Sequence, residues 1–270
     1  MDAVAGRKKA LIVIPAYNES RRLPRLLGDI RRSCARDLDA LCELRYLVVD
    51  DGSGTQESRS MRVLVETCGD RSLVCLLRLE TNLGKGGAIR AGFSRGLAQG
   101  FDFLGFIDAD GSVSIDDLHR LLRFLLSDFG MGAAGAIASR RPHPGFSVRR
   151  GPVRRLVGHA FSWFVCVLFG IAVDDPQCGL KIFRTEPLSR FLDAPSSARW
   201  VWDTELLASM LRAGLDVREV PVNWRETPGG KLSFLRDPLA MAAELFYYRW
   251  RMCGGPGEGG IRTHEAPCGA

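Results

Sequence analysis

A short apolar stretch that ends in two aspartates constrains this chain more than any other part of its sequence. Five mostly apolar residues, Phe103–Ile107, lead directly into Asp108 and Asp110, which are followed by a glycine. Such a run is typical of a strand buried on both faces, and ligands of open α/β sheets bind where such strands end. Alternate residues of an extended chain point the same way, so both carboxylates are spaced to reach one cation. A hard cation such as Mg²⁺ or Mn²⁺ suits these oxygens, although a solvated Asp-Gly turn has the same sequence.

The pattern of an apolar run followed by polar residues recurs along the first half of the chain. Runs at Ala10–Pro15, Arg45–Val49 and Ser72–Leu77 predict three strands before Phe103–Ile107, and small residues at 132–138 predict a fifth. Leucines at helical spacing lie between these runs. Strands that alternate with helices at this rhythm indicate βαβ units. We therefore expect an α/β fold with a mostly parallel central sheet flanked by helices.

Four groups of polar residues follow the first four of these strands. They are Pro15, Tyr17, Asn18 and Glu19; Asp50 and Asp51; Asn82 and Lys85; and Asp108 and Asp110. The carboxyl ends of parallel strands meet at one edge of a sheet, so the groups should converge. Glycines around Lys85 allow the backbone to approach a phosphate, and the lysine places a cation beside it. Four groups in the same register favour a metal and diphosphate site over four unrelated turns.

Composition limits the class of protein. The 270 residues are 46% hydrophobic and 25% charged, as expected for one large α/β domain. We assign residues 1–251 to that domain and expect residues 252–270, rich in glycine and proline, to be a disordered tail. The eight cysteines form no C-x-x-C pair and suggest core residues in a reducing compartment. No secretory signal or convincing membrane span is expected.

The net charge of +6 makes anionic partners plausible, and the basic residues gather in one segment. These are Arg140, Arg141, Arg149, Arg150, Arg154 and Arg155. An almost continuously apolar stretch follows, from Leu156 to Val173. It predicts either a buried core helix or a helix in a membrane interface with arginines at the headgroups, and the abutting basic and apolar blocks favour the second. Nucleic-acid binding is disfavoured, because the arginines are not interleaved with stacking aromatic residues.

Two later helices complete the expected elements. Asp203 and Glu205 lie in the first turn of one of them, where carboxylates either complement the helix dipole or serve a site. A last helix should begin at Asp237-Pro238 and carry an aromatic face, suited to a core or to a lipid interface.

The motifs taken together resemble those of the family 2 inverting glycosyltransferases of the GT-A fold. They are Pro15-Ala-Tyr-Asn-Glu19, Val49-Asp-Asp-Gly-Ser53, Asn82-x-Gly-Lys-Gly86 and Asp108-Ala-Asp110. Within that family the chain is similar to the dolichyl-phosphate and polyprenyl-phosphate sugar transferases, and most similar to the glucosyl type. Three features carry the closer resemblance: Gly111 after Asp110, Gln177-Cys-Gly-x-Lys181, and Asn223-Trp224 before Gly230-Lys231-Leu232.

The resemblance implies a nucleotide-sugar donor, UDP-glucose first, and a dolichyl or polyprenyl phosphate acceptor. The implied donor-binding residues are Pro15, Tyr17, Asn18, Glu19, Asp51, Asn82, Lys85 and Asp108. A metal, Mg²⁺ or Mn²⁺, would be bound by Asp108 and Asp110 and would neutralise the departing diphosphate. The candidate acceptor-binding residues are Arg140, Arg155, Gln177, Lys181, Glu205 and Lys231. Asp110, Asp203 and Arg140 are the candidate catalytic residues.

Other functions stay open at this point. The enzyme could use GDP-mannose, or it could act as a soluble transferase on a hydroxyl, with Asp203 or Glu205 as base. A third interpretation is a membrane-binding module with a vestigial donor pocket. The expected location is the cytosolic face of a membrane, that of the endoplasmic reticulum in a eukaryote or the plasma membrane in a bacterium. Oligomeric state is not predicted.

Overall fold

The computed structural model describes residues 7–33, 42–68, 73–194, 197–227 and 237–252, with only the backbone of residues 237–239. Within these ranges a seven-stranded sheet has the strand order β3-β2-β1-β4-β7-β5-β8. The strands are β1 (Lys8–Ala16), β2 (Cys42–Asp50), β3 (Val74–Arg78), β4 (Phe103–Ile107), β5 (Gly135–Ser139), β7 (Leu180–Arg184) and β8 (Val217–Pro221). The five strands expected in the first half are all present. Lys231 and the tail beyond Met252 lie outside the described residues, so their expected roles are not tested.

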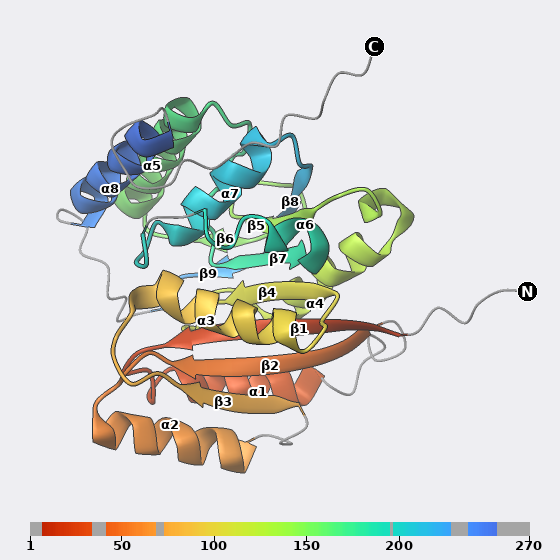
Figure 1. Ribbon diagram of the computed structural model, residues 1–270, viewed down its shortest axis with the longest axis vertical. Helices are drawn as coiled ribbons and strands as arrows, with labels where there is room; N and C mark the ends of the chain where they lie inside the picture. Colours follow the sequence, from red (N-terminus) through yellow and green to blue (C-terminus); the bar gives the residue numbers. More distant parts are fainter. Residues whose placement is uncertain (1–6, 34–41, 69–72, 195–196, 228–236, 253–270) are drawn as a thin grey trace, which may run out of the picture.

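The sheet is mostly parallel, as predicted, with one reversed strand. β7 runs antiparallel between β4 and β5, whereas β1 pairs in parallel with both β2 and β4 (Figure 1). β8 is an edge strand, which fits the proline at its end. β6 (Val148–Arg149) and β9 (Trp224–Arg225) form a small separate ribbon.

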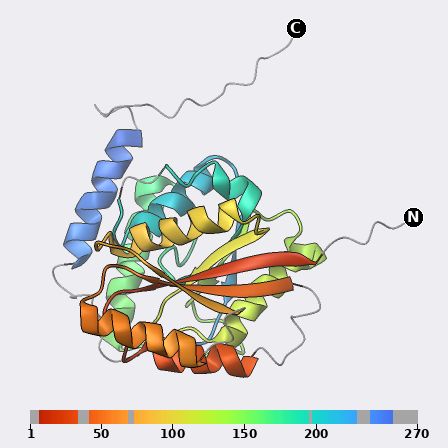
Figure 2. The same ribbon diagram turned by 60° about the horizontal axis from the view of Figure 1, so that its bottom comes forward.

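Helices cover both faces of the sheet. They are α1 (Leu23–Ser33), α2 (Thr55–Cys68), α3 (Gly84–Ala98), α4 (Ile115–Leu126), α5 (Pro152–Phe169), α6 (Thr185–Ser189), α7 (Trp202–Arg212) and α8 (Asp237–Met252). α1, α2 and α4 share one core cluster, and α3, α6 and α7 share the other. Figure 2 shows α1 and α2 on one side of the sheet and α3 on the opposite side.

Alternation along β1 explains the two cores. Ile12 and Ile14 pack into one cluster, and Leu11 and Val13 pack into the other. A strand that is apolar at every position is therefore buried on both faces, as its composition predicted. α4 begins directly after Ser114, whose hydroxyl accepts a hydrogen bond from the Asp117 backbone N–H at 3.1 Å.

A third cluster joins α5, α7 and α8 at one end of the molecule. α5 buries Val165 and Phe169 there, so the stretch from Leu156 to Val173 is partly a core helix. No helix in the described ranges is both long and apolar enough to cross a membrane.

Candidate active site

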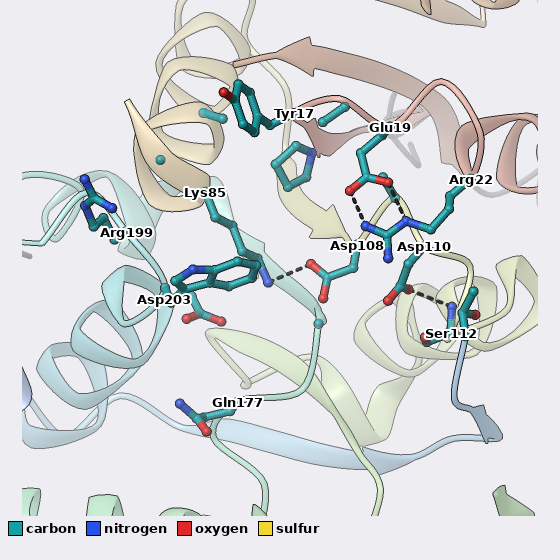
Figure 3. A pocket seen from close by; sticks show the side chains of 18 of the residues that line it. Tyr17, Glu19, Arg22, Lys85, Asp108, Asp110, Ser112, Gln177, Arg199 and Asp203 are labelled. Carbon is teal, nitrogen blue, oxygen red and sulfur yellow. Dashed lines mark hydrogen bonds and ion pairs between the residues drawn. The ribbon is translucent and has the colours of Figure 1, made fainter. Parts of the chain in front are cut away.

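The carboxyl ends of the parallel strands form one side of a cavity of about 410 Å³ (Figure 3). Most of the side chains expected at the site line it: Pro15, Tyr17, Glu19, Asp51, Asn82, Lys85, Asp108, Asp110, Arg140, Gln177 and Asp203. The four polar groups therefore converge from β1, β2, the start of α3 and the end of β4. The structure does not bring Asn18, Arg155, Lys181 or Glu205 into the lining.

Asp51 organises the loop that leads into α3. Its two carboxylate oxygens accept hydrogen bonds from the backbone N–H groups of Leu83 at 2.7 Å and Gly84 at 2.9 Å. The Asn82 side chain donates to the Asp51 carbonyl at 3.1 Å. Burial raises the pKa of Asp51, and the two backbone donors only partly offset this. Each carboxylate oxygen keeps a further lone pair, so Asp51 can still accept a hydrogen bond from a ligand.

Lys85 and Asp108 face each other across the cavity floor. The Lys85 Nζ lies 2.6 Å from Asp108 Oδ1, and it also lies over the rings of Phe106 (5.3 Å to the centroid) and Trp200 (5.7 Å). Burial alone would lower the pKa of Lys85, but the carboxylates of Asp108 and Asp203 outweigh burial and raise that pKa. Lys85 therefore remains an ammonium ion. It lies next to Asp108 and Asp110, which we call the acidic pair.

Arg22 is a second cation near the acidic pair, and the sequence did not single it out. Its guanidinium forms a two-point ion pair with Glu19, with Nε 2.6 Å from Oε2 (Figure 3). Burial opposes its charge, while Glu19, Asp110 and Asp108 together raise its pKa. Glu19 thus holds Arg22 at the cavity wall. An i,i+3 Glu-Arg spacing was the only local signal for it.

Asp203 lines the cavity and forms an ion pair with Lys181, which does not line it. The Lys181 side chain is fully buried and does not reach the cavity, so its predicted direct contact with an acceptor phosphate does not match the structure. A lysine in a β-strand that begins near the site gave no sign of its pairing with a helix residue 22 positions later. Its position makes Lys181 the partner that fixes the Asp203 carboxylate.

Glu205 is also placed away from the cavity. It is fully buried in α7, and its Oε2 accepts a hydrogen bond from the Ser197 backbone N–H at 3.0 Å. Asp203 and Glu205 are two positions apart, and a helix turns by about 200° over that spacing. Only Asp203 faces the site, so the predicted role of Glu205 toward sugar or acceptor is wrong for this geometry.

Arg140 lines the cavity while bound to Asp175. Its Nε and Nη2 lie 2.7 and 2.6 Å from the Asp175 carboxylate oxygens, and its guanidinium stacks 4.8 Å from the centre of the Trp224 ring. Burial would raise the pKa of Asp175, but attraction and hydrogen bonds from Arg140 outweigh it and hold that pKa below its usual value. Asp175 was not among the predicted residues.

Further arginines surround Arg140. Arg150 and Arg154 line the same cavity, and Arg154 is ion-paired with Glu226. Burial, and then repulsion from Arg140, lowers the pKa of Arg150 to about 10. Arg155 is exposed and contributes instead to a small neighbouring cavity. The arginine block was visible in the sequence, but which of its members face inward was not.

The loop tip that carries Asn18 lies at the edge of the site. Asn18 has a left-handed backbone (φ 51°), and its N–H donates to the Ser53 hydroxyl at 2.9 Å. This bond joins the loop after β1 to the loop after β2. Asn18 therefore shapes the cavity wall through its backbone, while its own side chain is exposed.

Residues 11–175, well over half of the chain, match the family model for glycosyl transferase family 2. The chain belongs to this family. The predicted resemblance is thereby confirmed, and the convergence of the four polar motifs has an explanation in a shared glycosyltransferase architecture.

Several proteins are similar to this family 2 glycosyltransferase over most of their length. The dolichyl-phosphate beta-glucosyltransferase of Homo sapiens is 33% identical over 90% of this chain and 76% of its own. That of Dictyostelium discoideum is 29% identical over 89% and 73%. A polyprenol monophosphomannose synthase from Mycolicibacterium smegmatis is 33% identical over 83% and 80%.

Solved structures confirm the expected fold. The glucosyl-3-phosphoglycerate synthase of Mycobacterium tuberculosis, crystallised with UDP, superimposes with a TM-score of 0.66. It is 22% identical and covers 94% of this chain and 83% of its own. Other crystals of that synthase contain UDP together with Mn²⁺ or Mg²⁺.

The acidic pair of this family 2 glycosyltransferase fits a hard divalent cation. Asp110 Oδ1 accepts a hydrogen bond from the Ser112 N–H at 2.9 Å, which orients its carboxylate at the rim. Across the described residues no group of three or more His, Cys, Asp or Glu side chains could enclose a metal. Two carboxylates suit an ion that takes its remaining oxygen ligands from water and phosphate, as Mg²⁺ commonly does.

Proposed function

We propose that this glycosyltransferase moves a hexosyl group from a nucleoside diphosphate sugar to the phosphate of a polyprenyl lipid, with UDP-glucose as donor, at the cytosolic face of a membrane. One observation carries the proposal: the acidic pair and a group of arginines line the same cavity. The acidic pair suits the donor, and the arginines suit an acceptor that is itself an anion. The two similar dolichyl-phosphate beta-glucosyltransferases support this pairing by their names.

The donor side comprises the loop after β1, Asp51 with Asn82, and Lys85. Asp51 and Asn82 would contact the nucleoside, and Lys85 would contact the diphosphate. Asp108 and Asp110 would hold Mg²⁺ or Mn²⁺, which supplies Lewis-acid neutralisation of the diphosphate when bound. Lys85 pairs with Asp108 before ligands arrive, so the ammonium is already positioned for a phosphate oxygen.

The acceptor side needs cations more than a base. A phosphomonoester has a second pKa of about 6 and is largely dianionic at pH 7, so its oxygen is already a nucleophile. That oxygen forms a bond to the anomeric carbon from the face opposite the diphosphate. The bond from carbon to the diphosphate oxygen breaks, and its electron pair leaves with the nucleoside diphosphate.

Three of the arginines that line the cavity, Arg140, Arg150 and Arg154, would hold this acceptor phosphate. Arg140 is already satisfied by Asp175, whereas Arg150 has no carboxylate within bonding distance among the described residues. Arg150 is therefore better placed than Arg155 to bind an added anion. Asp203, fixed by Lys181, is suited to accept hydrogen bonds from sugar hydroxyls. Gln177 also faces this space.

Radiolabelled transfer from UDP- and GDP-sugars to a short polyprenyl phosphate tests the proposal. We expect transfer from UDP-glucose that requires a divalent metal and falls by at least about a hundredfold in Asp110→Asn. Asp128→Asn removes an exposed carboxylate outside the cavity and should leave transfer unchanged. Full activity of Asp110→Asn at saturating metal would contradict the assignment.

A mannosyl donor is the second candidate, since one relative is a polyprenol monophosphomannose synthase. The same panel separates the two: transfer from GDP-mannose and none from UDP-glucose would replace the first candidate. An acceptor alcohol without phosphate tests the hydroxyl alternative. If the enzyme used the alcohol as fast as the polyprenyl phosphate, the arginines would not be needed to bind the acceptor.

A further inference from the structure

α5 carries an apolar stripe that no described residue covers. Val153, Leu156, Trp163 and Val167 are 70%, 71%, 68% and 63% exposed, respectively. Together with exposed Ala160 they are separated by three or four residues, so they lie on one face of the helix. The opposite face is packed in the cluster with α7 and α8. Exposed apolar side chains that form such a large and regular stripe indicate a binding surface.

α8 extends the same surface. It lies beside α5 (Figure 1), and the rings of Phe164 and Phe246 meet at 5.3 Å between centroids. Tyr247 and Trp250, which follow Phe246 by one and four residues, are 54% and 49% exposed, and Phe246 itself is 55% exposed. The buried side of α8 is fixed by Tyr248, whose hydroxyl is 2.6 Å from the Ser209 hydroxyl.

We use the name α5–α8 platform for this surface. It comprises Val153, Leu156, Trp163, Val167, Phe246, Tyr247 and Trp250. The active-site cavity is lined from the buried faces of both helices. Arg154 and Gly158 of α5 share the helix row of buried Ser162. Met241 of α8 shares the row of buried Leu245, so these cavity-lining residues face away from the platform.

Charge and aromatic composition identify the partner. α5 contains no acidic residue, and exposed Arg149 and Arg155 lie before it and in its first turn, respectively. Arg249 and Arg251 lie in the last turn of α8. Basic residues that flank apolar helices complement an anionic lipid surface. Tryptophan and tyrosine, with one apolar and one polar end, concentrate at the level of lipid headgroups.

We infer that the α5–α8 platform docks on an anionic bilayer, with both helices lying on the surface. This inference rests on the proposed function and names the surface that would hold the enzyme at the membrane. Docking through this surface would keep the enzyme at the bilayer that contains the polyprenyl chain of the acceptor.

Vesicle co-sedimentation of the full chain tests the inference without substrate. Trp163→Glu, Val167→Glu and Trp250→Glu each place a carboxylate in the platform. We expect each variant to bind phosphatidylglycerol-containing vesicles at least about tenfold more weakly, since burial of one large apolar side chain accounts for that factor. Phosphatidylcholine vesicles should bind the unaltered chain more weakly than anionic ones.

Val63→Glu is the matched control for Val167→Glu. Val63 is 55% exposed on α2, at the far end of the molecule from α5 and α8 (Figure 1). It should leave vesicle binding unchanged. Equal binding by the platform variants and the unaltered chain would overturn the inference, as would an equal loss in Val63→Glu.

Transfer to a short, water-soluble isoprenyl phosphate separates this inference from the proposed function. The platform variants should retain that transfer and lose transfer to acceptor embedded in vesicles. If the short acceptor is used but vesicle binding is insensitive to the platform, only the docking inference fails. If no isoprenyl phosphate is used at all, the proposed function fails. Platform-dependent dimers without vesicle binding would assign the surface to a second copy of the chain and overturn the docking inference.

Discussion

At the scale of single residues, two buried ion pairs define the base of the cavity. Lys181 with Asp203 and Arg140 with Asp175 each join residues from different elements. Each pair keeps one charged side chain at the cavity wall in a fixed orientation. A buried pair contributes little net stability, but removal of one partner leaves an uncompensated charge and is strongly destabilising. The pairs are thus constraints on position more than sources of stability.

In Arg140→Gln, the loss in free energy of unfolding should depend on pH. The folded-state pKa of Asp175 is held below its ordinary value of 3.8, so its pairing stabilises the fold above that value and loses the contribution as pH falls through the lowered pKa. We expect the free energy of unfolding of Arg140→Gln to be about 3 kcal/mol lower near neutral pH. The difference should shrink below about pH 4, where Asp175 becomes protonated in the unfolded chain and in the variant.

Denaturant unfolding at several pH values measures that difference. Arg218→Gln is the control, because Arg218 forms an exposed pair with Asp216 and its loss should cost under about 1 kcal/mol. A penalty for Arg140→Gln that is the same at every pH would show that the guanidinium acts through packing on Trp224 and not through Asp175.

At the scale of elements, the start of α3 is joined to the segment before α7. The Gly86 and Gly87 N–H groups donate to the carbonyls of Arg199 and Ala198 at 3.1 and 2.9 Å. These donors would otherwise be unsatisfied in the first turn of a helix. This contact positions Lys85 beside Asp108 and places the Trp200 ring near the Lys85 ammonium. The glycines of this loop therefore allow two elements to pack closely.

Gly86→Ala should disrupt this junction. An added Cβ would lie 2.2 Å from the Trp202 Cβ, and both atoms belong to well-packed helices. We expect a loss of about 1–3 kcal/mol in the free energy of unfolding, with weaker nucleotide binding because Lys85 moves with the helix. Gly132→Ala, where a Cβ meets nothing within 4 Å, is the control for the glycine change itself. Thermal unfolding and UDP titration of both variants check the prediction, and unchanged values for Gly86→Ala would contradict it.

At the scale of the whole molecule, the cavity lies between the strands of the first half and the helices of the second. Ligands that contact both parts stabilise the folded state by mass action, by about 2.7 kcal/mol at a ligand concentration of 100 Kd. We expect UDP to raise Tm and Mn²⁺ to raise it further when UDP is present. Asp110→Asn should retain the increase due to UDP and lose the increment due to Mn²⁺. A metal increment that survives in this variant would place the ion elsewhere.

The sequence by itself determined the sheet and the edge at which the donor site forms. Strands buried on both faces are apolar throughout, and parallel strands bring whatever follows them to one edge. The convergence of Tyr17, Asp51, Lys85 and Asp108 follows from these local rules alone. The order of the motifs was then sufficient to indicate the family.

Tertiary structure decided which of the remaining charged residues face the cavity. Lys181 and Glu205 have the residue types of a binding site but are buried against Asp203 and Ser197, while Arg150 and Arg22 line the cavity. It also decided that α5 buries one face and leaves the other exposed. These outcomes depend on contacts between residues far apart in the chain, and burial and charge pairing at such contacts leave no periodic pattern in the sequence.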